Sequence, residues 1–276
     1  MTNLAILLCV YSGDDVRFLT QCLESLEHQV GCRPDLYINI DGEIDERLGS
    51  LISSWGKRDW VYVKSRKVNL GLAASLNELI DLALENKRYE FLARMDSDDI
   101  AFSDRFLKQL EFFRENPEVD VLGGSCVEID INNKPVMLKV METDDAWLKK
   151  NLIRRTPFIH PTVMFRRRVF ESGIRYRTDT HLSEDTFLWV DLARAGFYFA
   201  NLTDLLIYYR VTNELFQRRS GWKKAVSEAK ARIQSIKSQK GVSVVDVFWV
   251  FSYFLLRVSP QGVIRFMYRV FRGYTG

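Results

Sequence analysis

The first hundred residues alternate short apolar runs with segments of helical periodicity. Four runs have the composition of strands: Leu4–Val10, Asp35–Asp41, Val61–Lys64 and Glu90–Met95. Between them, apolar residues recur every three or four positions, which is the spacing of an amphipathic helix. Alternation of this kind predicts an α/β fold, in which helices cover both faces of a mainly parallel sheet.

Polar residues follow three of these strands. They are Tyr11-Ser12, Asp41-Gly42 and the acidic stretch Asp96-Ser97-Asp98-Asp99. Ligands of open parallel sheets bind beyond the carboxyl ends of the strands. We therefore expect one crevice that draws on all three segments, although Asp41-Gly42 alone also fits a simple turn.

The acidic stretch is the strongest single motif. In an extended chain Asp96 and Asp98 project to the same face, and carboxylates packed this closely repel one another unless a cation or a donor-rich ligand relieves them. Mg²⁺ is typically bound by one or two carboxylates together with substrate phosphates. The alternative is a solvated acidic turn that caps a helix beginning near Ser103.

The middle of the chain is less regular. A hairpin is predicted from Val119–Asp130 and Pro135–Val140, which flank two asparagines. Phe158–Phe165 has the composition of a strand, with an interruption at His160-Pro161. Ser183–Ala195 has helical spacing with Ser183 placed as N-cap, and Leu205–Val211 is predicted as the last strand.

From Gly221 onward the pattern is helical, which predicts a main domain at residues 1–220 and a C-terminal region at 221–276. Residues 215–276 hold 12 Lys/Arg against Glu228 and Asp246, a net of +10, whereas the preceding 214 residues hold 27 basic and 34 acidic groups. Val242–Leu256 is apolar but shorter than the roughly 20 residues that span a bilayer. Val263–Phe271 is apolar with interspersed arginines.

Basic, aromatic-rich helices of this kind lie in the membrane interface, attracted by anionic lipid. The alternative is that they pack on the main domain. No motif indicates nucleic-acid binding. Four scattered cysteines show no metal-binding spacing, and the first residues lack the features of a signal peptide. We therefore expect a cytoplasmic protein that is peripheral at the inner face of the cell membrane.

The motifs, in this order and spacing, resemble family 2 glycosyltransferases of the GT-A fold, an inverting class common in bacterial surface polysaccharide assembly. The resemblance runs from about Leu4 to Ser220. The segments that carry it are Val10-Tyr11, Asp41-Gly42, Asn69-Leu70-Gly71-Leu72 with Leu76-Asn77, Arg94-Met95-Asp96-Ser97-Asp98-Asp99, and Ser183-Glu184-Asp185.

The resemblance implies a role for each matching position. Contacts to the nucleotide-sugar would come from Val10, Tyr11, Asp41, Asn69, Arg94, Asp96 and Arg210. Asp98 and Asp96 would hold Mn²⁺ or Mg²⁺. Asp185 would be the general base, a role that typically contributes 10²–10⁴-fold to rate, although acidic residues also commonly occupy first helical turns. Glu184 and His160 would lie on the acceptor side.

One feature departs from the family pattern. Several relatives place a histidine soon after the final Tyr-Arg, whereas here Tyr209-Arg210-Val211 is followed by Thr212, which leaves the third protein ligand of the metal open. Arg210, Arg218 and Arg219 are candidates for holding the diphosphate, and solvated surface arginines are the alternative.

These inferences predict a metal-dependent inverting hexosyltransferase that uses a UDP-sugar and a lipid-linked saccharide acceptor. Two alternatives remain open at this point. A sugar-nucleotide nucleotidyltransferase would favour a glycine-rich loop after the first strand, and residues 9–14 contain one glycine. A non-catalytic GT-A scaffold at the membrane is disfavoured because the main acidic positions are all occupied.

Overall fold

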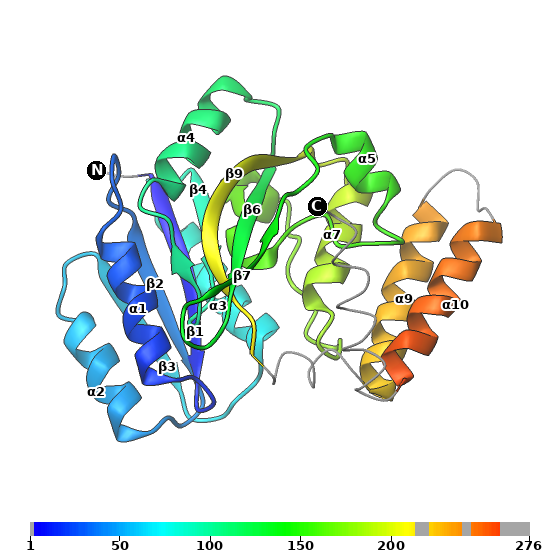
Figure 1. Cartoon of the computed structure of the whole chain (residues 1–276). Helices are drawn as coiled ribbons and strands as arrows, with labels where there is room; N and C mark the ends of the chain where they lie inside the picture. Colours follow the sequence, from blue (N-terminus) through cyan, green and yellow to red (C-terminus); the bar gives the residue numbers. More distant parts are fainter. Residues whose placement is uncertain (1–2, 213–220, 239–243, 260–276) are drawn as a thin grey trace.

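The computed structural model describes residues 3–212, 221–238 and 244–259. Within them, a nine-stranded mixed sheet forms the centre of the molecule and helices lie on both of its faces (Figure 1). The strand order is β3-β2-β1-β4-β8-β6-β9-β5, and β7 pairs with β6 outside this path. The predicted α/β class is confirmed.

Four parallel strands form one half of the sheet. They are β1 (Leu4–Tyr11), β2 (Asp35–Asp41), β3 (Val61–Arg66) and β4 (Phe91–Met95). Each matches a predicted strand to within two residues at either end. Their carboxyl ends meet at one edge, as expected for parallel strands that are joined by helices.

The other half of the sheet is mixed. It contains β5 (Ile100–Ala101), β6 (Val121–Ile129), β7 (Pro135–Lys139), β8 (Met164–Arg166) and β9 (Phe199–Arg210). The predicted hairpin is confirmed by the antiparallel β6–β7 pair. β9 pairs with β6 in parallel and with β5 antiparallel.

Two strand predictions in this half need correction. The strand expected over Phe158–Phe165 begins only at Met164, because residues 160–162 form a 3₁₀ turn in which Pro161 has no N–H for a ladder. The last strand begins at Phe199 rather than Leu205. Its partner β6 continues across a bulge near Ser125, and this pairing extends β9 through the polar residues that precede Leu205.

Two hydrophobic cores lie on opposite faces of the sheet, and β1 contributes to both by alternation. One core is covered by α1 (Val16–Glu27), α2 (Glu46–Trp55) and α4 (Arg105–Glu115). The other is covered by α3 (Leu72–Glu85), α5 (Asp145–Lys150), α6 (Arg167–Glu171) and α7 (Glu184–Arg194). The periodicity that predicted the first helices reflects these buried stripes.

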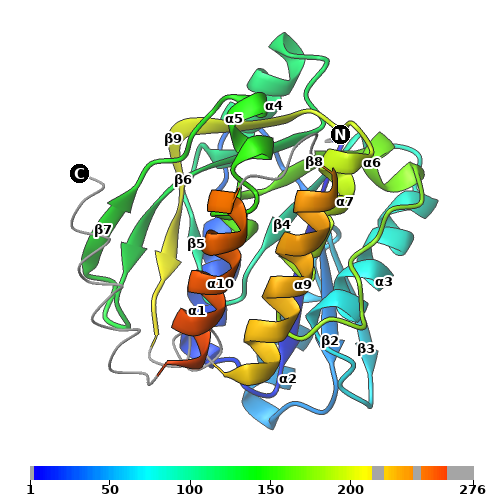
Figure 2. The same cartoon turned by 90° about the vertical axis from the view of Figure 1, so that its right-hand side faces the viewer.

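The C-terminal region is helical, as predicted, in α9 (Trp222–Ser238) and α10 (Val244–Val258). Helix α9 lies between α7 and α10 (Figures 1 and 2), so the main domain covers one side of α9. Among the described residues, no helix combines the length and the apolar character needed to cross a bilayer. Arg218, Arg219 and the apolar segment Val263–Phe271 lie outside the described residues, and the domain boundary near residue 220 stays a prediction.

Candidate active site

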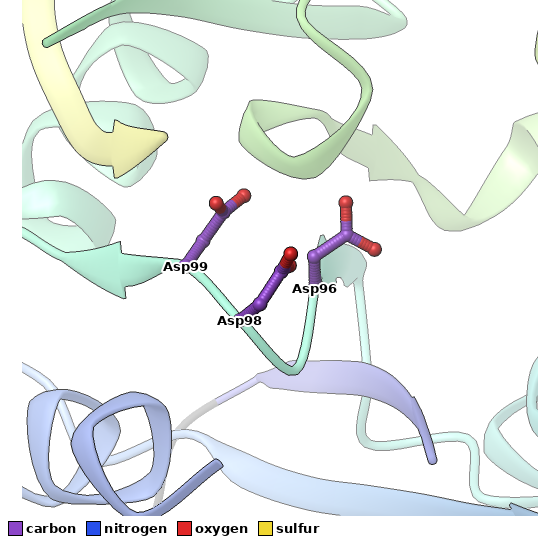
Figure 3. Close-up of side chains that lie close together, drawn as sticks. All are labelled: Asp96, Asp98 and Asp99. Atoms are coloured by element: carbon purple, nitrogen blue, oxygen red, sulfur yellow. The ribbon is translucent and has the colours of Figure 1, made fainter. Parts of the chain in front are cut away.

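The acidic stretch forms a tight turn between β4 and β5, at the carboxyl edge of the parallel strands. Asp96, Asp98 and Asp99 each offer one carboxylate oxygen, and these oxygens lie within 4.8 Å of one another. Figure 3 shows the three side chains leaving the turn toward the same side. Asp99 is fully buried, while Asp96 and Asp98 are partly accessible.

The end of β9 holds this turn in place. The Arg210 N–H donates to Asp99 Oδ1 at 2.8 Å, and its Nε donates to the Asp98 carbonyl at 2.8 Å. Its other guanidinium nitrogens donate to the Asp130 carbonyl, Asn133 Oδ1 and Gln21 Oε1, at 3.1, 2.7 and 2.9 Å. Arg210 is buried. Its predicted contact to the donor stays untested, and in this structure its side chain holds the turn.

Two residues that sequence reasoning missed support the turn from other sides. Asp14 accepts the Tyr11 N–H at 2.8 Å and the Ser97 hydroxyl at 2.9 Å, and thereby ties the β1–α1 loop to the acidic stretch. Arg105 is fully buried and donates to the Arg94 carbonyl at 2.9 Å. Burial lowers the pKa of Arg105 to about 9. In the sequence, Asp14 is marked only by being a polar residue shortly after the end of the first strand.

The electrostatics of the turn favour a bound cation. Burial, followed by the nearby charges of Asp96 and Asp14, raises the pKa of Asp98 to about 7. Burial, followed by the charges of Asp98 and Asp96, holds the pKa of Asp99 well above its usual range. Asp99 Oδ2 is buried and has no hydrogen-bond partner among the described residues. An all-oxygen cluster of this kind fits Mg²⁺ or Mn²⁺, since hard cations prefer carboxylate ligands.

Arg94 lies beside the acidic turn on the face of β4 that is covered by α3 and α7. Its guanidinium forms an ion pair with Asp96, and the Arg94 side chain is 4% exposed. Arg94 Nε and Nη1 are buried and have no partner among the described residues. Buried N–H donors rarely remain unpaired. Arg94 therefore has hydrogen-bonding capacity that the rest of the described chain does not use.

The predicted nucleotide contacts lie at the ends of β1 and β2. Asp41 is buried and accepts N–H groups of Leu70 and Gly71, both at 2.8 Å, as well as Arg66 Nε at 2.8 Å. Asn69 Nδ2 donates to the Asp41 carbonyl at 3.1 Å. Asp41 thus shapes the loop before α3, and its predicted contact to the nucleotide-sugar, which stays untested, would add to the hydrogen bonds already present. Val10 is buried, which leaves only its main chain for a ligand, and the Tyr11 side chain is exposed.

Gly42 and Gly71 give this loop its path. Gly42 has a φ of +92° and Gly71 a φ of +89°, a region that L-residues with a side chain rarely adopt. A Cβ on Gly42 would also lie 3.1 Å from the Asn69 main-chain nitrogen. Gly42 therefore bends the chain directly after β2, which ends at Asp41, and the Asn69 loop packs against this bend.

The start of α7 carries the predicted base, Asp185, and its neighbour Glu184. Asp185 Oδ1 accepts the Thr186 N–H at 2.6 Å. Burial, followed by the Asp185 charge, raises the pKa of Glu184. Burial raises the pKa of the Tyr176 hydroxyl, on which the charges of Arg94, Asp185 and Glu184 also act. Helix α7 packs on the face of the sheet that bears Leu92, and by strand alternation this is also the face of Arg94.

His160 and Asn77 both contact Tyr176. The Nε2 of His160 lies 2.8 Å from the Tyr176 hydroxyl oxygen, and the ring also packs edge-on against Trp189. Burial and the charge of Arg94 lower the pKa of His160 well below its usual range, so the ring is neutral. Asn77 brackets the Tyr176 main chain, donating to its carbonyl at 2.8 Å and accepting its N–H at 2.9 Å. An acceptor contact for His160 stays a prediction.

Comparison with known families decides the class of protein. The family model described as Glycosyl transferase family 2 matches residues 6–174, and the model described as Glycosyl transferase family group 2 matches residues 91–272. The chain is a family 2 glycosyltransferase. Membership in this family confirms the resemblance found in the sequence and disfavours the nucleotidyltransferase alternative.

This glycosyltransferase is similar over nearly all of its length to a bacterial galactosyltransferase. It is 29% identical over 278 residues to the UDP-Gal:alpha-D-GlcNAc-diphosphoundecaprenol beta-1,3-galactosyltransferase of Escherichia coli, covering 98% of this chain and 94% of the relative.

Two solved structures show the same GT-A fold. TarS 1-349 of S. aureus, in complex with UDP-GlcNAc, has a TM-score of 0.60 at 15% identity, covering 94% of this chain and 82% of TarS. The mannosyltransferase PcManGT of Pyrobaculum calidifontis, in complex with GDP-Man and Mn²⁺, has a TM-score of 0.58 at 13% identity, covering 92% and 85%. These identities establish a shared fold only.

Proposed function

We propose that this glycosyltransferase transfers a hexose from a UDP-sugar to a hydroxyl of a lipid-linked saccharide, with inversion at the anomeric carbon, in surface polysaccharide assembly. The observation that carries the proposal is the acidic turn of residues 96–99, whose carboxylate oxygens lie within 4.8 Å of one another at the carboxyl edge of the parallel strands. The Glu184-Asp185 pair begins α7, and the charge of Arg94, which pairs with Asp96, acts on the Glu184 carboxylate. The diphosphoundecaprenol named for the Escherichia coli relative supports the class of acceptor.

The acidic turn is suited to the diphosphate end of the donor. Asp98 and Asp96 would hold Mn²⁺ or Mg²⁺, which in such sites acts as a Lewis acid on phosphoryl oxygens. Arg94 adds a buried positive charge beside Asp96, and its unpaired Nε and Nη1 are suited to oxygen acceptors. These groups favour the state in which the leaving nucleoside diphosphate gains negative charge.

Asp185 is suited to the acceptor end. An alcohol is a weak nucleophile at neutral pH, and a carboxylate that takes its proton during attack raises the rate. The first turn of a helix favours negative charge because main-chain N–H groups there point outward. Attack from the side opposite the leaving diphosphate forms the new C–O bond as the old one breaks, and one such displacement inverts the anomeric carbon.

The outer face of α10 is suited to a membrane interface. Its exposed apolar residues include Val244, Val245, Val247, Phe248, Phe251 and Leu255. The acidic residue of this helix, Asp246, lies 3.4 Å from Arg154 of the main domain. A lipid-linked acceptor keeps its reacting sugar close to the bilayer surface, so a face of this kind would bring enzyme and acceptor together.

The test separates donor binding from proton removal. Asp98→Asn is expected to lose Mn²⁺-dependent affinity for UDP in calorimetry, whereas Asp185→Asn should bind UDP with Mn²⁺ as the wild type does and transfer hexose about 10²–10⁴-fold more slowly. Asp81→Asn is the matched control, because it makes the same change to an exposed carboxylate of α3 that lies outside the candidate site. Unchanged metal-dependent UDP affinity in Asp98→Asn would refute the metal assignment, and unchanged transfer in Asp185→Asn would refute the base.

A further inference from the structure

Helix α9 buries charged groups on the side that faces the main domain. Lys224, Glu228 and Arg232 are 7%, 6% and 3% exposed and follow one another at four-residue spacing. Lys224 Nζ lies 3.0 Å from Glu228 Oε1, and Arg232 Nη2 lies 3.8 Å from Glu228 Oε2. Burial of charge is costly unless it is paired and hydrogen-bonded. A helix that served only to cover the domain would achieve the same packing with apolar residues.

The polar groups of α9 contact the segment that precedes the candidate base. Lys224 Nζ donates to the Leu182 carbonyl and, at 3.3 Å, to Ser183 Oγ. Ser227 Oγ accepts the His181 N–H at 3.3 Å. Residues 181–183 lead directly into Glu184 and Asp185. Helix α9 therefore holds residues 181–183, the three residues that immediately precede Glu184 and Asp185.

This segment has little local structure to hold it. Leu182 has a φ of +53°, a left-handed conformation that is uncommon for a residue with a branched side chain. Ser183 occupies the N-cap of α7 but makes no capping hydrogen bond, and its hydroxyl donates to the His181 carbonyl at 3.2 Å instead. Strained conformations of this kind persist where surrounding contacts determine them. Here those contacts come from Lys224 and Ser227.

We propose that Lys224 is a positioning residue that sets the orientation of Glu184 and Asp185 toward the acceptor. The proposal rests on the proposed function, in which Asp185 takes the proton of the acceptor hydroxyl. Lys224 holds the segment before the pair through two hydrogen bonds, one to the Leu182 carbonyl and one to the Ser183 hydroxyl, and its charge acts on the adjacent Glu184 carboxylate. The C-terminal helices are then part of the working transferase as well as its outer surface.

The test removes the ammonium and keeps most of the side-chain length. Lys224→Met is expected to lower kcat by at least about tenfold, a part of the typical contribution of a general base, with KM for the UDP-sugar and Mn²⁺-dependent UDP affinity within twofold of wild type. Lys224→Arg should recover most of kcat because it keeps the charge and the donors. Lys230→Met, at an exposed position of the same helix, is the matched control.

A second variant guards against misfolding. Lys224→Met takes one ionic partner from the buried Glu228 carboxylate, so Lys224→Met/Glu228→Gln removes both charges, and its kcat should fall equally. The proposal is wrong if either variant retains wild-type kcat, if Lys224→Arg restores nothing, or if UDP binding falls together with kcat in both. Asp185→Asn is measured in parallel: if it transfers normally, the assigned base is wrong, whereas a slow Asp185→Asn beside a normal Lys224→Met refutes only the role of Lys224.

Discussion

Substitution of Arg210 distinguishes a residue that holds the acidic turn from one that binds the diphosphate. The side chain makes four hydrogen bonds, to the Asp98 carbonyl, the Asp130 carbonyl, Asn133 and Gln21. At a net 0.5–1.5 kcal/mol each, their loss in Arg210→Met lowers the free energy of unfolding by about 2–6 kcal/mol. For a chain of this size, about 4 kcal/mol corresponds to a fall in Tm of roughly 8–16 °C.

Thermal unfolding of the metal-free protein measures this change, and calorimetry with UDP and Mn²⁺ measures donor binding. Arg210→Lys should be nearly as unstable as Arg210→Met, because a single ammonium cannot reach acceptors that surround a planar guanidinium. Arg17→Met is the control, since the Arg17 guanidinium also lies over the Phe18 ring, but Arg17 is exposed and its side chain donates to the Ile131 carbonyl at 3.4 Å. Wild-type Tm with weakened UDP binding in Arg210→Met would show that Arg210 contacts the donor and that our assignment is wrong.

Two further predictions concern the buried arginines of β4 and α4 and the exposed face of α10. Arg94→Met should leave Tm unchanged or raised, because two unpaired buried donors disappear and Asp96 remains partly exposed to water; it should also weaken UDP binding about tenfold or more. Arg105→Met should instead lower Tm, because Arg105 donates hydrogen bonds to Arg94, Met95 and Gln109. Equal stability losses in the two variants would contradict this contrast. The double variant Phe248→Glu/Phe251→Glu should no longer sediment with anionic vesicles but should bind UDP as the wild type does. Val136→Glu, at an equally exposed apolar position on β7, is the control and should still sediment with the vesicles. Loss of vesicle binding in both variants would refute a specific role for α10.

The parallel half of the sheet was predictable because its signals are local. Each strand from β1 to β4 is a buried run followed by a helical stripe, and adjacent βα units place their strands side by side. The mixed half was less predictable. The two residues of β5 are too few for a pattern, and β9 is set by its pairing with β6, a strand more than seventy positions earlier. Periodicity indicates which face of a helix or strand is buried, but it does not indicate which strand, far away in the sequence, pairs with it.

The same limit applies to the site. The acidic turn was evident because three carboxylates follow a strand directly. Arg210 was identified as a candidate for the diphosphate, but its partners Gln21 and Asp130 lie 189 and 80 positions away, so no local pattern indicates that it holds the turn. Asn77 and Tyr176 meet across 99 positions. Lys224 was one of twelve basic residues in the tail, and only its burial against residues 181–183 distinguishes it.

The positions of the nearby arginines explain how the negative charge of the acidic turn is compensated while its carboxylates remain available to a cation. Three neighbouring carboxylates need compensating positive charge, yet arginines paired directly with their oxygens would compete with a metal. Arg105 donates to the Arg94 carbonyl of β4 and Arg210 to the Asp98 carbonyl of the turn, so both guanidinium groups lie close to the turn while bonding to main-chain oxygens. Their charge lowers the cost of holding the carboxylates together, and their hydrogen bonds fix the backbone that orients them. Arg94 differs because it pairs with a carboxylate, and that carboxylate belongs to Asp96. A cation that recruits Asp96 would therefore free the Arg94 guanidinium at the moment when a diphosphate arrives to accept its hydrogen bonds.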